Sequence, residues 1–434
     1  MPSELRSFAS RSFAVDPQLR HRTAEATLTV RGPDGAPLAD TEVTVAQVRH
    51  RFLFGCIGFD LVPLANGETE EAPGSAFGGA AAPAAARSLA DHWLEVFNAT
   101  TLPFYWSEFE PERRRPDTTR LRRAAEWFAE RGVVVKGHPL AWHTLAPDWL
   151  LGSTNAEIEE ALRGRIRRDV TDMAGVVDTW DAINEVVIMP VFDKYDNALT
   201  RLSRDLGRIG TINLAFEEAR AANPSATLLL NDFDMSTAYE CLIEGCLEAG
   251  VQIDALGLQS HMHQGYWGEE RTLEVIERFA RYGLPIHFTE STLLSGDLMP
   301  PEIEDLNDWQ VDEWPSTPEG EARQADEIVR HHRTLLSHPA VQGSTYWGIT
   351  DAGAWLGAPV GLLRADGSPK PAYDALRELV KGEWWLAPTT LRTDAEGRVP
   401  VTGLLGDYAV TAGAGTAEVA LDQAGPAHIE VRLG

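Results

Sequence analysis

Residues 180–185 read Trp180-Asp181-Ala182-Ile183-Asn184-Glu185, and apolar residues flank this stretch at Val176, Val177 and 186–188. A short, almost continuous apolar run is typical of a parallel strand that helices cover on both faces. Asn184 and Glu185 are then expected at the carboxyl end of the strand, where it meets solvent. In a parallel α/β barrel that end carries the chemistry. A glutamate there can also simply face water or cap the next helix.

A second expected strand ends in the same way, at Leu284-Pro285-Ile286-His287-Phe288-Thr289-Glu290. Two carboxylates at the carboxyl ends of two barrel strands form the arrangement that hydrolysis of a glycosidic bond requires. Glu185 and Glu290 are therefore the candidate catalytic pair.

The composition limits the partners of the chain. Its net charge is −27, which repels the phosphate backbone of nucleic acid and the surface of an anionic membrane. Residues 1–22 contain no apolar core of a secretory signal, and no run reaches the length of a transmembrane helix. Cys56, Cys241 and Cys246 do not form a disulfide pattern. These features predict a cytoplasmic protein that binds neither nucleic acid nor membrane.

Strand-like and helical segments alternate between residues 50 and 385, in the βα order of a parallel sheet. The expected strands are Phe52–Cys56, Val96–Ala99, Val133–Gly137, Val177–Asn184, Thr227–Asn231, Ala255–Gln259, Pro285–Thr289 and Ser344–Ile349. This number fits an α/β fold of the (β/α)8 TIM barrel type. Two connections are long. We expect residues 62–90 to be a mobile loop, and residues 291–320, with Trp309 and Trp314, to be functional.

The two ends of the chain carry short β patterns. Residues 24–31 and 41–48 alternate apolar and polar around Gly32-Pro33-Asp34-Gly35, which predicts a hairpin, and residues 389–434 hold several more short segments. Because a lone hairpin is marginally stable in water, we expect both ends to form one small accessory β module. The predicted domains are an N-terminal extension with hairpin (1–49), a catalytic barrel (50–385) and C-terminal β segments (386–434).

Several expected strand ends carry groups suited to a sugar. They are the stretch from His138 to His143, Asn231-Asp232, Gln259-Ser260-His261, and the segment from Trp347 to Trp355. Pyranose rings present hydroxyls at their edge and C–H groups on their face, so hydrogen-bonding and flat aromatic side chains at one barrel end suit them. A carbohydrate is therefore the expected ligand.

In this ordered set the chain resembles glycoside hydrolase family 10, whose best-known members are endo-1,4-β-xylanases, over roughly residues 50–380. The resemblance implies a retaining mechanism with Glu185 as general acid/base and Glu290 as nucleophile. It implies that Asn184 contacts the sugar 2-hydroxyl and that His261 orients Glu290. The expected substrate-binding residues are His138, Trp142, Asn184, Gln259, His261, Trp347, Trp355 and Tyr105. No cofactor or metal is implied, because His261 and His263 lack an obvious third ligand.

One segment departs from the family pattern. After the second strand, xylanases carry a Glu, an Asn and a Lys that bind the neighbouring sugar on the non-reducing side, whereas this chain has an apolar stretch at 102–105. The first prediction is a xylanase-like retaining glycosidase. The alternatives are a glycosidase or diglycosidase for small, plant-type aryl glycosides or short oligosaccharides, and a carbohydrate-binding barrel without catalysis. The sequence leaves the oligomeric state open.

Overall fold

The computed structural model describes residues 16–69, 75–79 and 86–434. One compact unit comprises Leu53–Ala375, and a second combines the N-terminal segment up to Phe52 with Leu376–Gly434. Part of the predicted N-terminal extension (1–15) and part of the predicted mobile loop (70–74 and 80–85) lie outside the described residues. None of the helices in the described ranges is long and apolar enough to cross a membrane.

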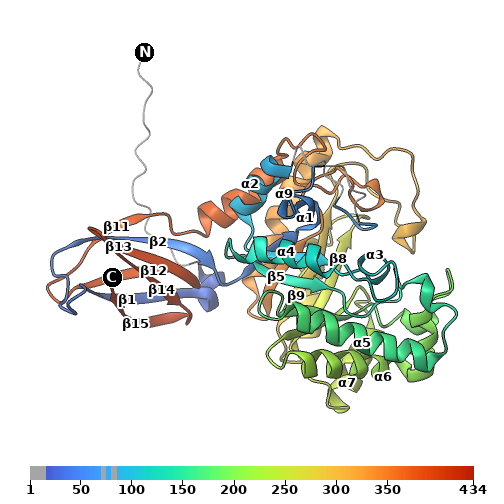
Figure 1. Ribbon diagram of the computed structural model, residues 1–434. Helices are drawn as coiled ribbons and strands as arrows, with labels where there is room; N and C mark the ends of the chain where they lie inside the picture. The colour runs from blue at the N-terminus through green and yellow to red at the C-terminus, as the bar shows by residue number, and fades with distance from the viewer. Residues whose placement is uncertain (1–15, 70–74, 80–85) are drawn as a thin grey trace. The chain divides into compact units, whose positions relative to one another are not determined.

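The larger unit is a closed barrel of parallel strands that follow one another in chain order, and the last strand closes against the first (Figure 1). The strands are β3 (Leu53–Ile57), β4 (Ala99–Pro103), β5 (Val134–His138), β6 (Thr179–Asn184), β7 (Thr227–Asp232), β8 (Ala255–Met262), β9 (Ile286–Leu293) and β10 (Val341–Tyr346). This arrangement confirms the predicted (β/α)8 barrel.

Helices alternate with the strands. They are α1 (Val62–Ala65), α2 (Ala86–Val96), α3 (Trp106–Phe109), α4 (Thr118–Ala129), α5 (Asn155–Met173), α6 (Ala198–Ala222), α7 (Thr237–Glu248), α8 (Gly268–Ala280), α9 (Pro318–Ser337) and α10 (Pro371–Glu378). Helix α5 shows why they form: Thr154 and Glu157 make a capping box at its start. Ile158, Leu162 and Ile166 then recur at helical spacing and are buried.

The second barrel strand differs from its prediction. The sequence suggested Val96–Ala99, but Val96 ends helix α2 and β4 begins at Ala99. Trp93 and Val96 are both buried, so their apolar character belongs to the inner face of α2. The strand itself uses two threonines, at 100 and 101, and the sequence reading assigned those residues to the following loop.

The terminal segments form two sheets. One contains β1 (Thr23–Arg31) between β12 (Arg398–Leu404) and β15 (Gly425–Arg432). The other runs in the order β11 (Thr389–Arg392), β2 (Glu42–His50), β13 (Gly406–Ala412) and β14 (Gly415–Leu421), with red C-terminal strands beside the blue β2 in Figure 1. The buried residues of both sheets join one apolar cluster. We call these seven strands the β module.

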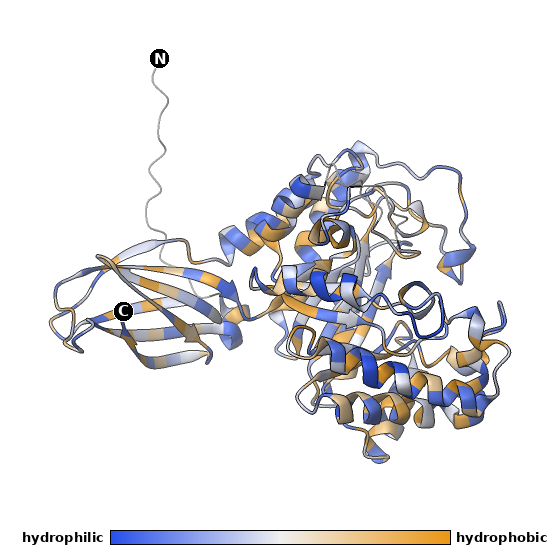
Figure 2. Ribbon diagram, viewed as in Figure 1, coloured by the Kyte–Doolittle hydropathy of each residue, from blue (hydrophilic) through white to orange (hydrophobic). Residues whose placement is uncertain are grey.

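The predicted N-terminal hairpin is wrong, because β1 and β2 lie in different sheets and each pairs with C-terminal strands. The alternation of apolar and polar residues, visible along the strands in Figure 2, fixes which face of each strand is buried. It does not fix the neighbour. Leu28 of β1 and Val45 of β2 share the apolar cluster although their strands are not hydrogen-bonded to each other.

Candidate active site

The carboxyl ends of neighbouring barrel strands bring the predicted polar residues together. His138 ends β5, Asn184 ends β6, and β8 carries Gln259 and His261. Glu290 lies in β9, next to β8 in the barrel. Asn184, Gln259, His261 and Glu290 are connected by hydrogen bonds, in part through Asn231, so that residues distant in sequence form one polar network.

Glu185 follows the last residue of β6 and has a left-handed backbone with φ 54°, which is uncommon outside glycine. Its carboxylate accepts hydrogen bonds from Trp142 Nε1 at 2.8 Å and from Gln259 Nε2 at 3.1 Å. Burial, and then the negative charge of Glu290, raise the pKa of Glu185 to about 8. At neutral pH the carboxyl group is therefore largely protonated and able to donate a proton.

Glu290 has the opposite electrostatic setting. Its carboxylate accepts a hydrogen bond from Asn231 Nδ2 at 3.0 Å and lies 3.0 Å from His261 Nε2. Burial alone would raise its pKa, but electrostatic interactions with His138, His261 and Lys136, together with the His261 hydrogen bond, outweigh this and hold the pKa below its ordinary value. Glu290 is thus ionised beside a protonated Glu185.

An amide network fixes how Asn184 faces the site. Asn231 Nδ2 donates to Asn184 Oδ1 at 2.7 Å, and Gln259 Nε2 donates to the same oxygen at 3.1 Å. The Asn184 amide nitrogen is consequently turned towards Glu185 Oε1, 3.2 Å away, and remains a donor for a ligand. Gly257 makes room for Asn231, because a Cβ at 257 would lie 2.2 Å from Asn231 Oδ1.

A buried ion cluster lies behind the two carboxylates, and the sequence reading missed two of its members. Asp181 accepts from Lys136 Nζ at 2.6 Å and from His138 Nδ1 at 2.7 Å. The other ring nitrogen of His138 lies 4.0 Å from Glu290 Oε1. Lys136 stands two residues before His138 on one strand, and this spacing places both side chains on the same face. That spacing was a usable signal for Lys136.

The predicted aromatic residues surround these polar groups. Trp347 lies 5.4 Å from His138, and Trp355 lies 4.9 Å from His261, measured between ring centroids. Tyr105 packs edge-on against His138 at 5.6 Å. Its buried hydroxyl has no hydrogen-bond partner within the described residues. Trp142 lies 5.7 Å from Tyr105.

Phe77 is a site residue that the sequence reading did not select. Its ring lies 5.4 Å from Tyr105, 5.2 Å from Trp142 and 5.7 Å from Trp355. It therefore joins aromatic side chains from three separate barrel loops. Phe77 is the only aromatic residue between positions 62 and 90, and this isolation among Gly, Ala and Pro was the available signal.

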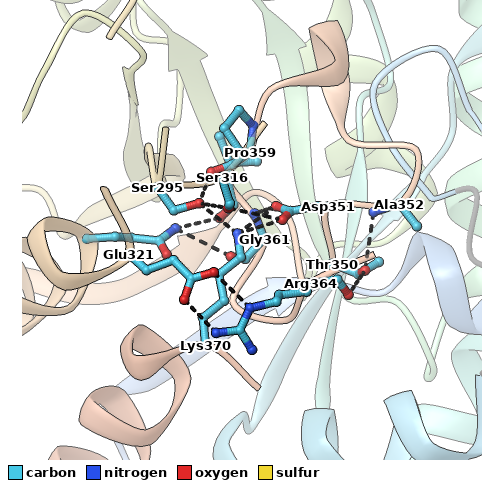
Figure 3. A network of polar contacts seen from close by, with 12 residues as sticks. Ser295, Ser316, Glu321, Thr350, Asp351, Ala352, Pro359, Gly361, Arg364 and Lys370 are labelled. Atoms are coloured by element: carbon cyan, nitrogen blue, oxygen red, sulfur yellow. Dashed lines mark hydrogen bonds and ion pairs between the residues drawn. The ribbon is translucent and has the colours of Figure 1, made fainter. Parts of the chain in front are cut away.

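The loops that follow β9 and β10 are held together by a buried polar network (Figure 3). Lys370 is fully buried and donates from Nζ to Ser295 Oγ and to Asp351 Oδ1, both at 2.8 Å. Ser295 belongs to the loop after β9, whereas Asp351 belongs to the loop after β10 that carries Trp355. The ammonium group thus links the two loops that border the site.

Of the two tryptophans in the predicted functional loop at 291–320, Trp314 contacts His263 beside the site, whereas Trp309 contacts Trp314. Trp314 lies 6.1 Å from His263, and Trp309 packs on Trp314 at 6.2 Å. His263 lies beside His261, but its Nδ1 faces Thr292 Oγ1 at 3.4 Å. Across the described ranges, no group of three or more His, Cys, Asp or Glu side chains is arranged to hold a metal ion.

The chain is similar to known glycoside hydrolases. The family described as "Glycosyl hydrolase family 10" matches residues 77–379. Endo-1,4-beta-xylanase B of Thermotoga neapolitana is 29% identical over 298 residues, which are 64% of this chain and 78% of that protein. Endo-1,4-beta-xylanase A of Caldicellulosiruptor saccharolyticus is 28% identical over 283 residues, covering 61% and 79%.

Solved structures give the same fold. Native xylanase 10B from Thermotoga maritima is 26% identical, with a TM-score of 0.56, covering 68% of this chain and 90% of that one. Xylanase 10B from Thermotoga petrophila, solved in complex with xylobiose, has a TM-score of 0.60 at 22% identity and covers 76% and 94%. At that identity the second likeness supports the fold alone.

Proposed function

Because the chain belongs to glycosyl hydrolase family 10, we propose that it hydrolyses β-1,4-xylosidic bonds with Glu185 as general acid/base and Glu290 as nucleophile. It is a retaining, xylanase-like glycoside hydrolase, and its substrate is a carbohydrate. The names of the curated relatives support xylan-type substrates. The observation that carries the assignment of roles is the opposite pKa shift of two carboxyl groups in one hydrogen-bond network.

In the first step of the proposed reaction, an oxygen of ionised Glu290 attacks the anomeric carbon. The bond to the leaving oxygen breaks, and Glu185 donates its proton to that oxygen. The product is a glycosyl ester on Glu290 and an ionised Glu185. Asn231 and His261 hold the two oxygens of Glu290, so the attacking group is oriented before the sugar arrives.

In the second step Glu185 acts as the base. Once Glu290 is esterified, its negative charge is gone, and the pKa of Glu185 falls because that charge was one cause of its elevation. Glu185 then accepts a proton from water, whose oxygen attacks the anomeric carbon and releases Glu290. Two inversions leave the anomeric configuration unchanged.

Hydrolysis of xylo-oligosaccharides, followed by ¹H NMR of the newly formed anomer, tests the proposal. We expect the β-anomer to appear first and the α-anomer to follow by mutarotation. The Glu290→Gln variant serves as the control and should release no product. Initial formation of the α-anomer, or the absence of hydrolysis of any β-1,4-linked xylo-oligosaccharide by the wild-type protein, would refute the assignment.

A second substrate preference has a specific observation in its favour. Phe77, Tyr105, Trp142 and Trp355 form a continuous aromatic cluster beside the carboxylates. Aromatic rings accept the C–H face of a sugar but offer no partner to its hydroxyls, at a cost of about 1–3 kcal/mol for each hydroxyl that is buried unpaired. This favours short glycosides over a long chain that must pass the cluster. A kcat/KM for soluble xylan equal to or above that for aryl xylosides would exclude the preference.

A further inference from the structure

Arg165 lies in helix α5 and is almost completely buried, with 2% of its surface exposed. Its guanidinium group donates to backbone carbonyls outside its own helix. Nη1 donates to the Leu140 oxygen at 2.8 Å, while Nη2 donates to the Pro139 oxygen at 3.0 Å and to the Phe104 oxygen. One side chain thus holds the segments that follow β4 and β5.

Each of these carbonyls adjoins a residue of the candidate site. Phe104 precedes Tyr105, Pro139 follows His138, and Leu140 stands two positions before Trp142. The Trp142 indole in turn donates to Glu185 at 2.8 Å. A chain of contacts therefore leads from Arg165, through loop backbone, to the proposed general acid.

The charge of Arg165 is compensated locally. Its Nε donates to Asp169 Oδ2 at 3.2 Å, and Arg168 shares that carboxylate through Nε at 2.8 Å. Arg168 also pairs with Glu110 at 3.0 Å, which makes a neutral group of two cations and two anions. Burial lowers the pKa of Arg165 to about 10, so the guanidinium stays charged at neutral pH.

From these contacts we infer that Arg165 is a positioning residue, which fixes the two loops so that the Trp142 indole meets Glu185 and Tyr105 lies against His138. The inference rests on the proposed function of Glu185. A guanidinium is suited to the task because its five N–H groups lie in a planar fork, and four contacts of this fork are in use here. A lysine has fewer donors and cannot reach all four acceptors.

The first test is Arg165→Lys, which keeps the positive charge and changes only the geometry. The charged groups that influence Glu185 are Glu290 and Asp232, and neither is altered. We expect kcat/KM on an aryl xyloside to fall on the order of 10- to 100-fold, as for a small misplacement of catalytic groups. The alkaline limb of the pH profile should move upwards by up to about 1 pH unit, because the Trp142 hydrogen bond favours the ionised form of Glu185.

The matched control is Arg220→Lys. Arg220 also donates from a helix to a loop carbonyl, that of Pro224 at 3.2 Å, and the loop at 223–226 before β7 contributes no residue to the candidate site. The control should leave both kcat/KM and the alkaline limb unchanged, whatever its effect on melting temperature. If Arg165→Lys lowers melting temperature as the control does, with kcat/KM and the pH profile unaltered, Arg165 is structural only and the inference fails.

A double-mutant cycle with Trp142→Phe provides a second readout. If Arg165 acts through Trp142, then Arg165→Lys should add little in the Trp142→Phe background, whereas independent effects would multiply. Full multiplication would overturn the inference. The indole N–H signal of Trp142 in ¹⁵N NMR reports the same contact without substrate, so the positioning role remains testable even if xylosides are not hydrolysed. An unchanged indole signal in Arg165→Lys would also count against it.

Discussion

Replacing Glu290 by glutamine removes a negative charge beside Glu185, and the pKa of Glu185 should fall from about 8 to roughly 6. Retaining enzymes place their two carboxyl groups about 5–5.5 Å apart. At that separation and an effective dielectric constant of about 20, two unit charges repel by about 3 kcal/mol. Each pKa unit corresponds to about 1.4 kcal/mol, which gives a decrease of roughly two units. Burial remains, so the pKa stays above that of a free glutamate.

The indole of Trp142 offers a way to measure this titration, because it donates to Glu185 Oε2. In protein with ¹⁵N-labelled tryptophan, the Trp142 signal is assigned from its loss in Trp142→Phe and followed against pH. We expect a midpoint near 8 in the wild-type protein and near 6 in Glu290→Gln. Glu217→Gln on the exposed face of helix α6 is the charge-matched control and should leave the midpoint unchanged.

A midpoint that stays near 8 in Glu290→Gln would refute this reasoning. It would mean that the two carboxyl groups are too far apart to sense each other. The protonated state of Glu185 would then depend on burial alone, and its change from acid to base between the two reaction steps would lose its electrostatic cause.

Three further predictions concern catalysis, stability and the aromatic cluster. Glu290→Ala should abolish turnover of all substrates, while Glu185→Ala should retain activity on aryl glycosides with good leaving groups and gain from added azide, as measured by phenol release. The pKa of Glu185 in the folded protein, about 8, exceeds its value in the unfolded chain, so the folded protein binds the extra proton. The free energy of unfolding of the wild-type protein should therefore fall as pH rises towards 8. Denaturant unfolding of Glu185→Gln should show a smaller fall over the same pH range. Phe77→Ala should raise kcat/KM for long xylo-oligosaccharides relative to aryl xylosides, and an unchanged ratio would contradict a blocking role for the ring.

Much of the barrel could be predicted because strands such as β6 and β7 are short, largely apolar runs that end in a polar residue. The prediction failed where an apolar residue could belong either to the buried face of a helix or to a strand. Val96 completes the inner face of α2, yet in sequence it looks like the start of β4. The strand pairing of the β module could not be predicted from the sequence for a different reason. Alternation determines which side of β1 is buried, but its partners come from the opposite end of the chain.

In the candidate site, too, the residues that local sequence identifies were predicted, whereas those that depend on long-range contacts were not. Asn184, Glu185 and Glu290 were found because a polar residue that follows a short apolar run is local information. Asp181 was passed over within the same stretch, since nothing in the sequence says that Lys136 and His138 from the neighbouring strand would converge on it. Such long-range pairings become visible only once the barrel has closed.

The β module combines strands from two segments that lie far apart in the sequence, and this has a consequence for biosynthesis. Strand β1 leaves the ribosome long before β12 and β15, with which it pairs. Roughly 370–400 residues separate β1 from these partners, which at translation speeds of about 5–20 residues per second corresponds to roughly 20–80 s. Throughout that time Leu28 and Val30 belong to an unpaired strand with an apolar face, a surface on which nascent chains aggregate. We therefore expect the apolar face of these early strands to need shielding from intermolecular contact until β12 and β15 have been made.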